Sequence, residues 1–197
     1  IALPDVDAML ILNLEGSAAA VEEEVAGTVS ACKKAGAIDV KTAATTEDAD
    51  ALWAGRKAIA SAVSRLDKNK AGPNIGGDCG VPLHRVTEML REIRKIAQES
   101  GITIATYGHV GDGNIHCGMA VNVLDEEELE RAKRAGAAIF DTALRLEGTT
   151  TPEHGVGAEK IRWLKEEHKS SYPLMLAIKK LIDPHNIMNP GKMFEIS

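Results

Sequence analysis

The sequence predicts an α+β fold in which a small antiparallel sheet is covered by helices. Short apolar bursts alternate with segments whose apolar residues recur at steps of three and four, so the chain reads β-α-β-α-β-α-β-α with short helices trailing. Four strands interleaved with helices suit a ferredoxin-like sheet, here with a helical C-terminal extension. No internal repeat or linker interrupts the order, and residues 1–197 are therefore interpreted as a single domain.

Two strands are expected in the first quarter of the chain. "DAMLILNLEG" (7–16) is an apolar burst closed by glycine, and "IDVKTAAT" (38–45) has the composition of a second strand. The segment between them has valines on one face and is expected to be a helix. Thr45 and Asp48 then stand at capping-box spacing and open a further helix through about Leu66.

The remaining elements are read in the same way. "AGPNIGGDCGVP" is a loop with a short strand, and "LHRVTEMLREIRKIAQES" is an amphipathic helix with Gly101 just past its end. "ITIATYGHV" is a strand, and after "CGMAVNV" the pair Asp125 and Glu128 caps a helix through about Leu146. Two further helices follow, the second opened by Ser171 and Pro173, before the chain ends in turns.

Composition excludes several classes of protein. The net charge of −6, without a basic stripe and with few aromatic residues, argues against a nucleic-acid partner. No apolar run approaches the roughly 18 residues of a membrane span. Three widely spaced cysteines form no disulfide framework, which favours a reducing cytosol. The expected location is therefore cytoplasmic, with a parent protein that is soluble or peripheral at the membrane.

The segment "YGHVGDGNIHCG" places four glycines around His109 and His116. A helix is disfavoured by those glycines, and on a flat strand the seven-residue step would leave the imidazoles on opposite faces, roughly 23 Å apart. A tight glycine loop would fold both rings toward one point. The alternative is that Asp112 and Gly113 form an ordinary hairpin turn beside incidental histidines.

A second glycine-rich segment, "TTTPEHGVG", favours the functional interpretation. It contains Glu153 and His154, and two neutral imidazoles with a carboxylate make a first-row divalent metal site with open coordination positions. Asp112 is an alternative ligand, or an acceptor for an imidazole N–H. Cys117 ranks below the histidines, because a neighbouring side chain on extended backbone points the other way.

Taken together, "YGHVGDGNIHCG", "PEHGVGAEK" and "DPHNIMNPGKMF" resemble, in order and spacing, the C-terminal domain of FAD-linked oxidases, and the resemblance covers nearly the whole chain. It implies the substrate- and metal-binding domain of a flavin-dependent 2-hydroxy acid dehydrogenase that oxidises D-lactate or glycolate to the 2-oxo acid. FAD would be bound mainly by an N-terminal domain of the same parent chain, absent here. The isolated chain is then expected to be inactive. Other oxidase subunits are further candidate partners.

The resemblance also implies roles for individual residues. It implies a divalent metal (Zn, Mn or Fe) on His109, His116 and Glu153, a general base at His154, substrate contacts at Arg56 and Asn114, and a flavin-side tail at Asn189 and Lys192.

The sequence departs from the family pattern at a few positions. Pro152 replaces the glycine usual before "EHG", and Gly118 stands where some members have a substrate-contacting asparagine. Ala60 and Gly76 stand where the family's D-2-hydroxyglutarate dehydrogenases have the Thr and Lys that hold a second substrate carboxylate. These departures favour a monocarboxylate substrate.

Two other functions fit parts of the sequence. Two histidines with a carboxylate are also the ligand set of non-haem iron oxygenases, so a stand-alone metalloenzyme is one alternative. A non-catalytic ferredoxin-like binding module is the other, although it leaves the histidine segments without a role.

Overall fold

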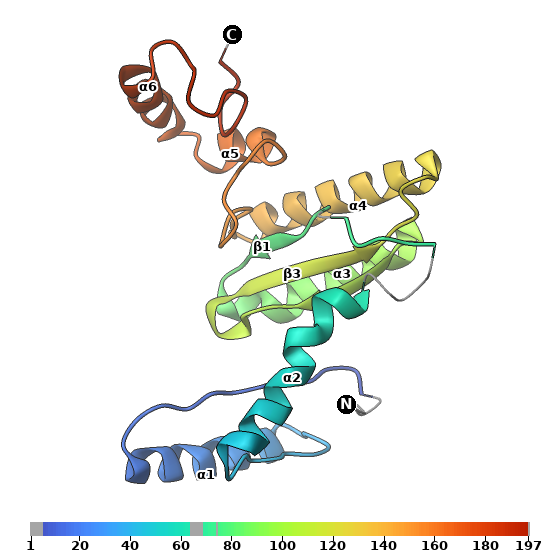
Figure 1. Cartoon of the computed structure of the whole chain (residues 1–197), viewed down its shortest axis with the longest axis vertical. Helices are drawn as coiled ribbons and strands as arrows, with labels where there is room; N and C mark the ends of the chain where they lie inside the picture. The colour runs from blue at the N-terminus through green and yellow to red at the C-terminus, as the bar shows by residue number, and fades with distance from the viewer. Residues whose placement is uncertain (1–5, 64–68, 74, 197) are drawn as a thin grey trace. The chain divides into compact units, whose positions relative to one another are not determined.

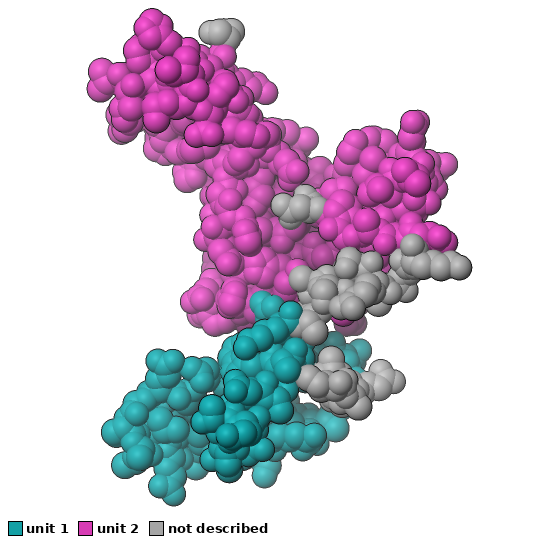
Figure 2. Space-filling model, viewed as in Figure 1, with its two compact units in different colours: residues 1–59 teal, residues 60–197 magenta. Residues whose placement is uncertain are grey.

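The computed structural model describes residues 6–63, 69–73 and 75–196. The chain divides into two compact units, residues 1–59 and residues 60–197, drawn in different colours in Figure 2. Each unit is described by itself below. The interpretation of the whole chain as a single domain stays a prediction.

The first unit contains helix α1 (Ala18–Lys34) and most of helix α2 (Thr46–Val63). The predicted capping box is confirmed, because Thr45 Oγ1 accepts from the Asp48 N–H at 3.1 Å and Asp48 Oδ2 accepts from the Thr45 N–H at 3.2 Å. Helix α1 begins after an N-cap serine and has no buried residue. Leu66, where the second helix was expected to end, lies outside the described residues.

The prediction of two strands in this unit was wrong. Within the described residues, segments 7–16 and 38–45 carry no strand, and apolar side chains such as Met9, Leu10 and Leu12 are exposed. Apolar alternation shows that a segment could serve as a strand, but a strand also needs a neighbour to accept its backbone hydrogen bonds. Neither segment is paired with such a neighbour here.

The second unit is built on a three-stranded antiparallel sheet of β1 (Asp78–Gly80), β2 (Thr103–Tyr107) and β3 (Asn114–Ala120), in the order β1-β3-β2. The α+β class is therefore confirmed, with fewer strands than a four-stranded ferredoxin-like sheet in the described part of the chain. The middle strand β3 is buried along almost its whole length. Strand β1 falls in the segment where a short strand was expected.

Helices α3 (Val86–Ser100) and α4 (Glu126–Arg145) pack against each other and against the sheet (Figure 1). Gly101 ends α3 in the left-handed region at φ 67°, and Asp125 caps α4 by accepting from the Glu128 N–H at 3.0 Å, so both predicted helix ends are confirmed. Short 3-10 turns precede α3 and β3, at Leu83–Arg85 and Val110–Asp112. The shared core includes Met89, Ile93, Ile115, Cys117, Met119 and Ile139.

The C-terminal part is helical, as predicted. Helices α5 (Ile161–Glu167) and α6 (Tyr172–Ile182) form a second apolar cluster around Val156, Leu164 and Phe194. The chain after α6 returns to the loop before α5, where the Met193 N–H donates to the Gly157 carbonyl at 2.8 Å. Among the described residues, every helix is too short or too polar to cross a bilayer.

Candidate functional site

The β2–β3 hairpin places His109 and His116 on one face of the sheet. Tyr107 and His116 are directly opposed across the strands, and His109 and Asn114 exchange both backbone hydrogen bonds at 3.1 and 3.2 Å. Because Asn114 and His116 are two residues apart on β3, their side chains share a face, and His109 joins them from the other side of the hairpin. The two imidazole centroids are 5.9 Å apart. The glycine loop therefore brings the two imidazoles close together, as its glycines indicate.

Two of these glycines are required by the hairpin. Gly113 has φ 74°, and a Cβ on it would come within 2.0 Å of the Val81 carbonyl oxygen. A Cβ on Gly108 would come within 2.3 Å of the Asn114 carbonyl oxygen. No other residue type fits either position without moving backbone, because its Cβ would occupy the space of a neighbouring backbone carbonyl.

The second glycine-rich segment crosses β1 and brings its polar residues to the same face. Thr149 pairs with Gly80 in an isolated antiparallel bridge, and the Pro152 ring lies over Gly80, which has no side chain to obstruct it. Pro152 therefore packs on β1 rather than pushing the loop away from the sheet. Glu153 and His154 follow directly, next to His116.

Four residues form a cluster with the geometry of a metal site. One ligand atom from each of Asp78, His116, Glu153 and His154 can be chosen so that all four lie within 4.8 Å of one another. His116 Nε2 is 3.4 Å from Glu153 Oε2, which is 4.0 Å from His154 Nε2. Two ligands held about 2.1 Å from a tetrahedral ion are themselves about 3.4 Å apart, so the first pair already has the separation that coordination requires. The donor set fits a divalent ion.

Asp78 is the residue that sequence reasoning missed. It lies on β1 directly opposite His116 and is 3% exposed. Its Oδ1 accepts from Asn114 Nδ2 at 2.8 Å and lies 3.5 Å from His116 Nδ1. Its Oδ2 accepts from the backbone N–H groups of Glu153 at 3.3 Å and His154 at 3.0 Å. A single aspartate after a glycine-rich segment has no local signature of this role.

The electrostatics favour a neutral imidazole beside a charged carboxylate. Burial lowers the pKa of His116, against the opposing effect of Asp78 and Glu153, and a neutral imidazole is the form that binds a metal. Burial alone would raise the pKa of Asp78. The hydrogen bonds from the His154 N–H and the Asn114 amide, with the charge of Lys160, outweigh it and lower that pKa.

The other predicted residues of this segment take different positions. His109 is exposed at the edge of the cluster, next to His116, and is not one of the four clustered residues. Asn114 is 5% exposed, and its Oδ1 has no hydrogen-bond partner among the described residues. Asp112 is exposed in the turn. Cys117 is buried in the core on the opposite face, beside Cys79.

Three predicted residues are not brought to this cluster by any described contact. Arg56 belongs to α2 in the first unit. Asn189 and Lys192 are exposed in the C-terminal turn, where the Lys192 N–H donates to the Asn189 carbonyl at 3.2 Å. The roles implied for these three residues stay predictions.

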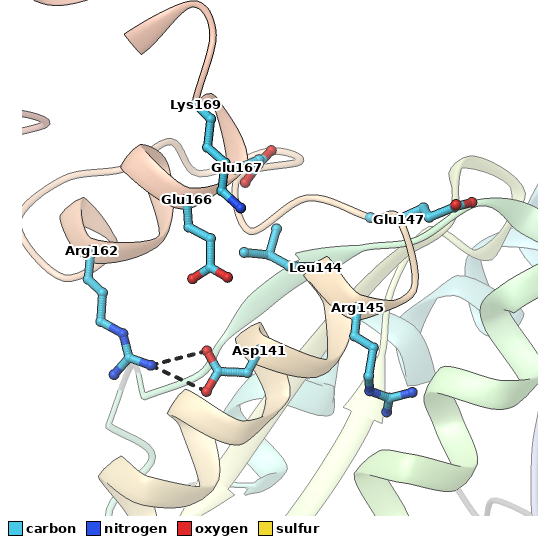
Figure 3. A pocket seen from close by; sticks show the side chains of 9 residues that line it. Asp141, Leu144, Arg145, Glu147, Arg162, Glu166, Glu167 and Lys169 are labelled. Carbon is cyan, nitrogen blue, oxygen red and sulfur yellow. Dashed lines mark hydrogen bonds and ion pairs between the residues drawn. The ribbon is translucent and has the colours of Figure 1, made fainter. Parts of the chain in front are cut away.

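A hollow of about 590 Å³ lies elsewhere, between α4 and α5 (Figure 3). Its lining mixes acidic and basic side chains, and Arg162 approaches the Asp141 carboxylate at 3.3 Å across it. Asp141 also accepts from the Trp163 indole N–H at 2.7 Å. None of the four clustered residues lines the hollow.

Residues 2–193 match the model of the family described as FAD linked oxidases, C-terminal domain. The chain belongs to that family. The match includes both glycine-rich segments and the C-terminal turn, the three motifs on which the resemblance was based.

Curated relatives carry related names. The chain is 39% identical over 188 residues to the glycolate oxidase subunit GlcD of Bacillus subtilis, and 33% identical over 190 residues to the probable mitochondrial D-lactate dehydrogenase of Danio rerio. It is 35% identical over 158 residues to the D-lactate dehydrogenase of Archaeoglobus fulgidus. These alignments cover 95%, 95% and 80% of this chain, but 39%, 38% and 34% of the relatives. The chain therefore spans about two fifths of the length of the first two.

Proposed function

We propose that this chain is the substrate- and metal-binding domain of a flavin-dependent dehydrogenase that oxidises a small 2-hydroxy acid, D-lactate or glycolate, to the 2-oxo acid. The observation that carries the proposal is the convergence of His116, Glu153, His154 and Asp78 on one face of the sheet. Membership of the FAD-linked oxidase family supplies the reaction class, and the names of the relatives supply the two candidate substrates.

A divalent ion would be held by His116 and Glu153, with His109 at the edge of the site completing the set. The facing atoms of the first two, His116 Nε2 and Glu153 Oε2, are 3.4 Å apart. The ion would supply Lewis acidity, which lowers the pKa of a hydroxyl group bound to it. Asp78 faces the other nitrogen of His116 and keeps the imidazole turned toward Glu153.

His154 is the proposed general base. Its side chain is 61% exposed, so it is open to an incoming molecule, whereas the His116 side chain is 10% exposed. Its Nε2 would accept the hydroxyl proton of the 2-hydroxy acid, since imidazole is the side chain that most often serves as a general base. Its backbone N–H is held by Asp78, which fixes the base relative to Glu153.

Asn114 has a buried acceptor suited to a substrate contact. Its Nδ2 is committed to Asp78, which identifies the unpartnered atom as the carbonyl oxygen Oδ1. A buried acceptor without a donor is costly, so a hydroxyl or water donor at this position would be stabilised. Arg56 is proposed to hold the substrate carboxylate, for which a guanidinium is suited.

The flavin partner is proposed to be an N-terminal FAD-binding domain of the same parent protein. FAD bound by that domain would supply the two-electron oxidant for the hydroxy acid. This chain would contribute Asn189 and Lys192, both exposed in the C-terminal turn, as edge contacts to that domain.

The proposal is tested by metal analysis and by turnover of D-lactate and glycolate, with and without the flavin domain. We expect about one divalent ion per chain, and turnover only when the flavin domain is present. Oxidation of substrate by this chain with metal and O₂ but no flavin would favour a stand-alone metalloenzyme. Absence of both metal and turnover in the complete protein would leave a binding module as the remaining function.

A further inference from the structure

We propose that Asp78 and Lys160 are positioning residues, a buried pair that attaches the loop of residues 150–157 to the sheet and turns His116 toward it. Neither residue was predicted to belong to the site. The inference deepens the metal site proposed above and rests on it, but its first consequence can be measured without a metal.

The carboxylate of Asp78 connects three separate segments. Its Oδ2 accepts from two successive backbone N–H groups, those of Glu153 and His154, which lie 75 and 76 residues away in the sequence. Its Oδ1 accepts from Asn114 Nδ2 on β3. With both oxygens engaged and the side chain 4% exposed, this carboxylate is occupied by the protein itself. Asp78 is therefore placed to orient the metal ligands, and we do not propose it as a ligand itself.

The same carboxylate sets the orientation of His116. Asp78 Oδ1 lies 3.5 Å from Nδ1, and Glu153 Oε2 lies 3.4 Å from Nε2 on the far side of the ring. A buried carboxylate beside Nδ1 favours the tautomer with the proton on that nitrogen, which leaves Nε2 free to coordinate. With a metal on Nε2, Asp78 and His116 would form a carboxylate–histidine–metal triad built from two neighbouring strands.

Lys160 attaches both sides of the loop to β1. It is 7% exposed, and its Nζ donates to the Asp78 carbonyl at 2.9 Å and to the Thr150 carbonyl at 2.6 Å. It also lies 3.7 Å from Asp78 Oδ2. Thr150 precedes Glu153 and His154, and Lys160 follows them, so a single ammonium group closes the loop at its base. The charge of Lys160 is balanced by the Asp78 carboxylate, which holds the middle of the loop at Glu153 and His154.

The chain offers a matched control for this pair. Glu128 is also a buried carboxylate, 7% exposed, and is paired with Lys70 at 2.7 Å at the start of α4. Neither Glu128 nor Lys70 is among the clustered residues. Glu128→Gln should therefore reproduce the loss of a buried ion pair without touching the loop.

The first test is amide hydrogen exchange on the metal-free chain. In the wild type, the Glu153 and His154 amides should be protected although their side chains are exposed. In Asp78→Asn these two amides should exchange about 10- to 100-fold faster, because one amide oxygen cannot replace both carboxylate oxygens. Lys160→Met should accelerate the same two amides, and Glu128→Gln should leave them unchanged.

The second test is metal binding, with Co²⁺ and Zn²⁺ as probes. Asp78→Asn should weaken binding by about 10- to 100-fold and change the visible absorption of bound Co²⁺, which reports ligand geometry. Glu128→Gln should do neither. Nitrogen NMR of the wild-type imidazoles should place the His116 proton on Nδ1, a measurement that needs no variant to fold.

The outcomes separate this inference from the proposed function. If the wild type binds no metal but its Glu153 and His154 amides depend on Asp78, the pair positions the loop and the metal proposal fails. If metal binds and these amides exchange equally in the wild type and Asp78→Asn, Asp78 is not a positioning residue. Unprotected amides in the wild type, or a His116 proton on Nε2, would overturn the inference even if no variant folded.

Discussion

The two glycine-rich segments that meet at the candidate site are held in different ways. The first, between β2 and β3, is closed mainly by bonds among its own residues: His109 exchanges backbone hydrogen bonds with Asn114, and the Gly113 N–H donates to the Val110 carbonyl at 3.1 Å. One backbone bond reaches it from outside, from the Val81 N–H to the Gly113 carbonyl at 3.0 Å. The second, residues 149–157, is held from outside by Asp78, by Lys160 and by Glu167, which accepts from Thr150.

This difference affects how substitutions act on the site. A locally closed hairpin depends on the backbone freedom of a few glycines, so its geometry is largely contained in its own sequence. A loop held by distant buried polar groups depends on each of those groups, because removing one leaves its partners unsatisfied. Substitutions far away in the sequence can therefore displace the second loop from its position.

The largest expected effect lies at the junction of the two segments. In the complete parent protein, His116→Ala should lose both bound metal and turnover, because it removes a ligand from β3. His154→Ala should keep most of the metal but lower turnover of D-lactate or glycolate by about 10²–10⁴-fold, the usual cost of losing a general base. Metal content and turnover are measured on both variants. If His154→Ala lost the metal while Glu153→Ala kept it, His154 would be the metal ligand and Glu153 the general base.

The requirement of the first segment for glycine is tested by Gly113→Ala. The residue has φ 74°, and the new Cβ would meet the Val81 carbonyl oxygen at 2.0 Å, so the free energy of unfolding should fall by about 1–3 kcal/mol or more. Gly111→Ala is the matched control in the same loop, because its Cβ would meet nothing within 4 Å. Equal stability of the two variants in denaturant unfolding would contradict a hairpin that requires glycine at position 113.

The long-range support of the second segment is tested by Glu167→Ala. Glu167 Oε2 accepts from both the N–H and the hydroxyl of Thr150 at 3.0 Å, and Thr150 is completely buried. Leaving these donors without a partner should cost about 1–3 kcal/mol. Glu166→Ala, at the exposed neighbouring position, should be nearly neutral. If Glu166→Ala lowered the free energy of unfolding equally, the loss of stability would arise from α5 itself rather than from the loop.

The smallest effect is expected at the N-terminal cap of α2, in the first unit. Thr45→Ala removes the side-chain half of the α2 capping box and should lower the free energy of unfolding by about 0.5–1 kcal/mol. It should not alter metal affinity or amide exchange at Glu153. A change in either would mean that the α2 cap influences the clustered residues.

The features predicted correctly from the sequence are those whose cause is local. The caps at Thr45 and Asp125 and the glycine end of α3 each depend on residues within one helical turn, and all three are confirmed. The two N-terminal strands were wrong for the converse reason, because a strand exists only with a partner and the apolar pattern does not name one.

The sequence by itself determined that two glycine-rich segments carry ligand-type residues and that the first folds back to bring His109 toward His116. Only the tertiary structure decided what joins the segments. The register of β1 on β3 sets Asp78 opposite His116, and the crossing of the second segment over Gly80 brings Glu153 and His154 within reach of the same carboxylate. Register and crossing are properties of packed strands, and residues 75 positions apart leave no local pattern from which their contact can be predicted.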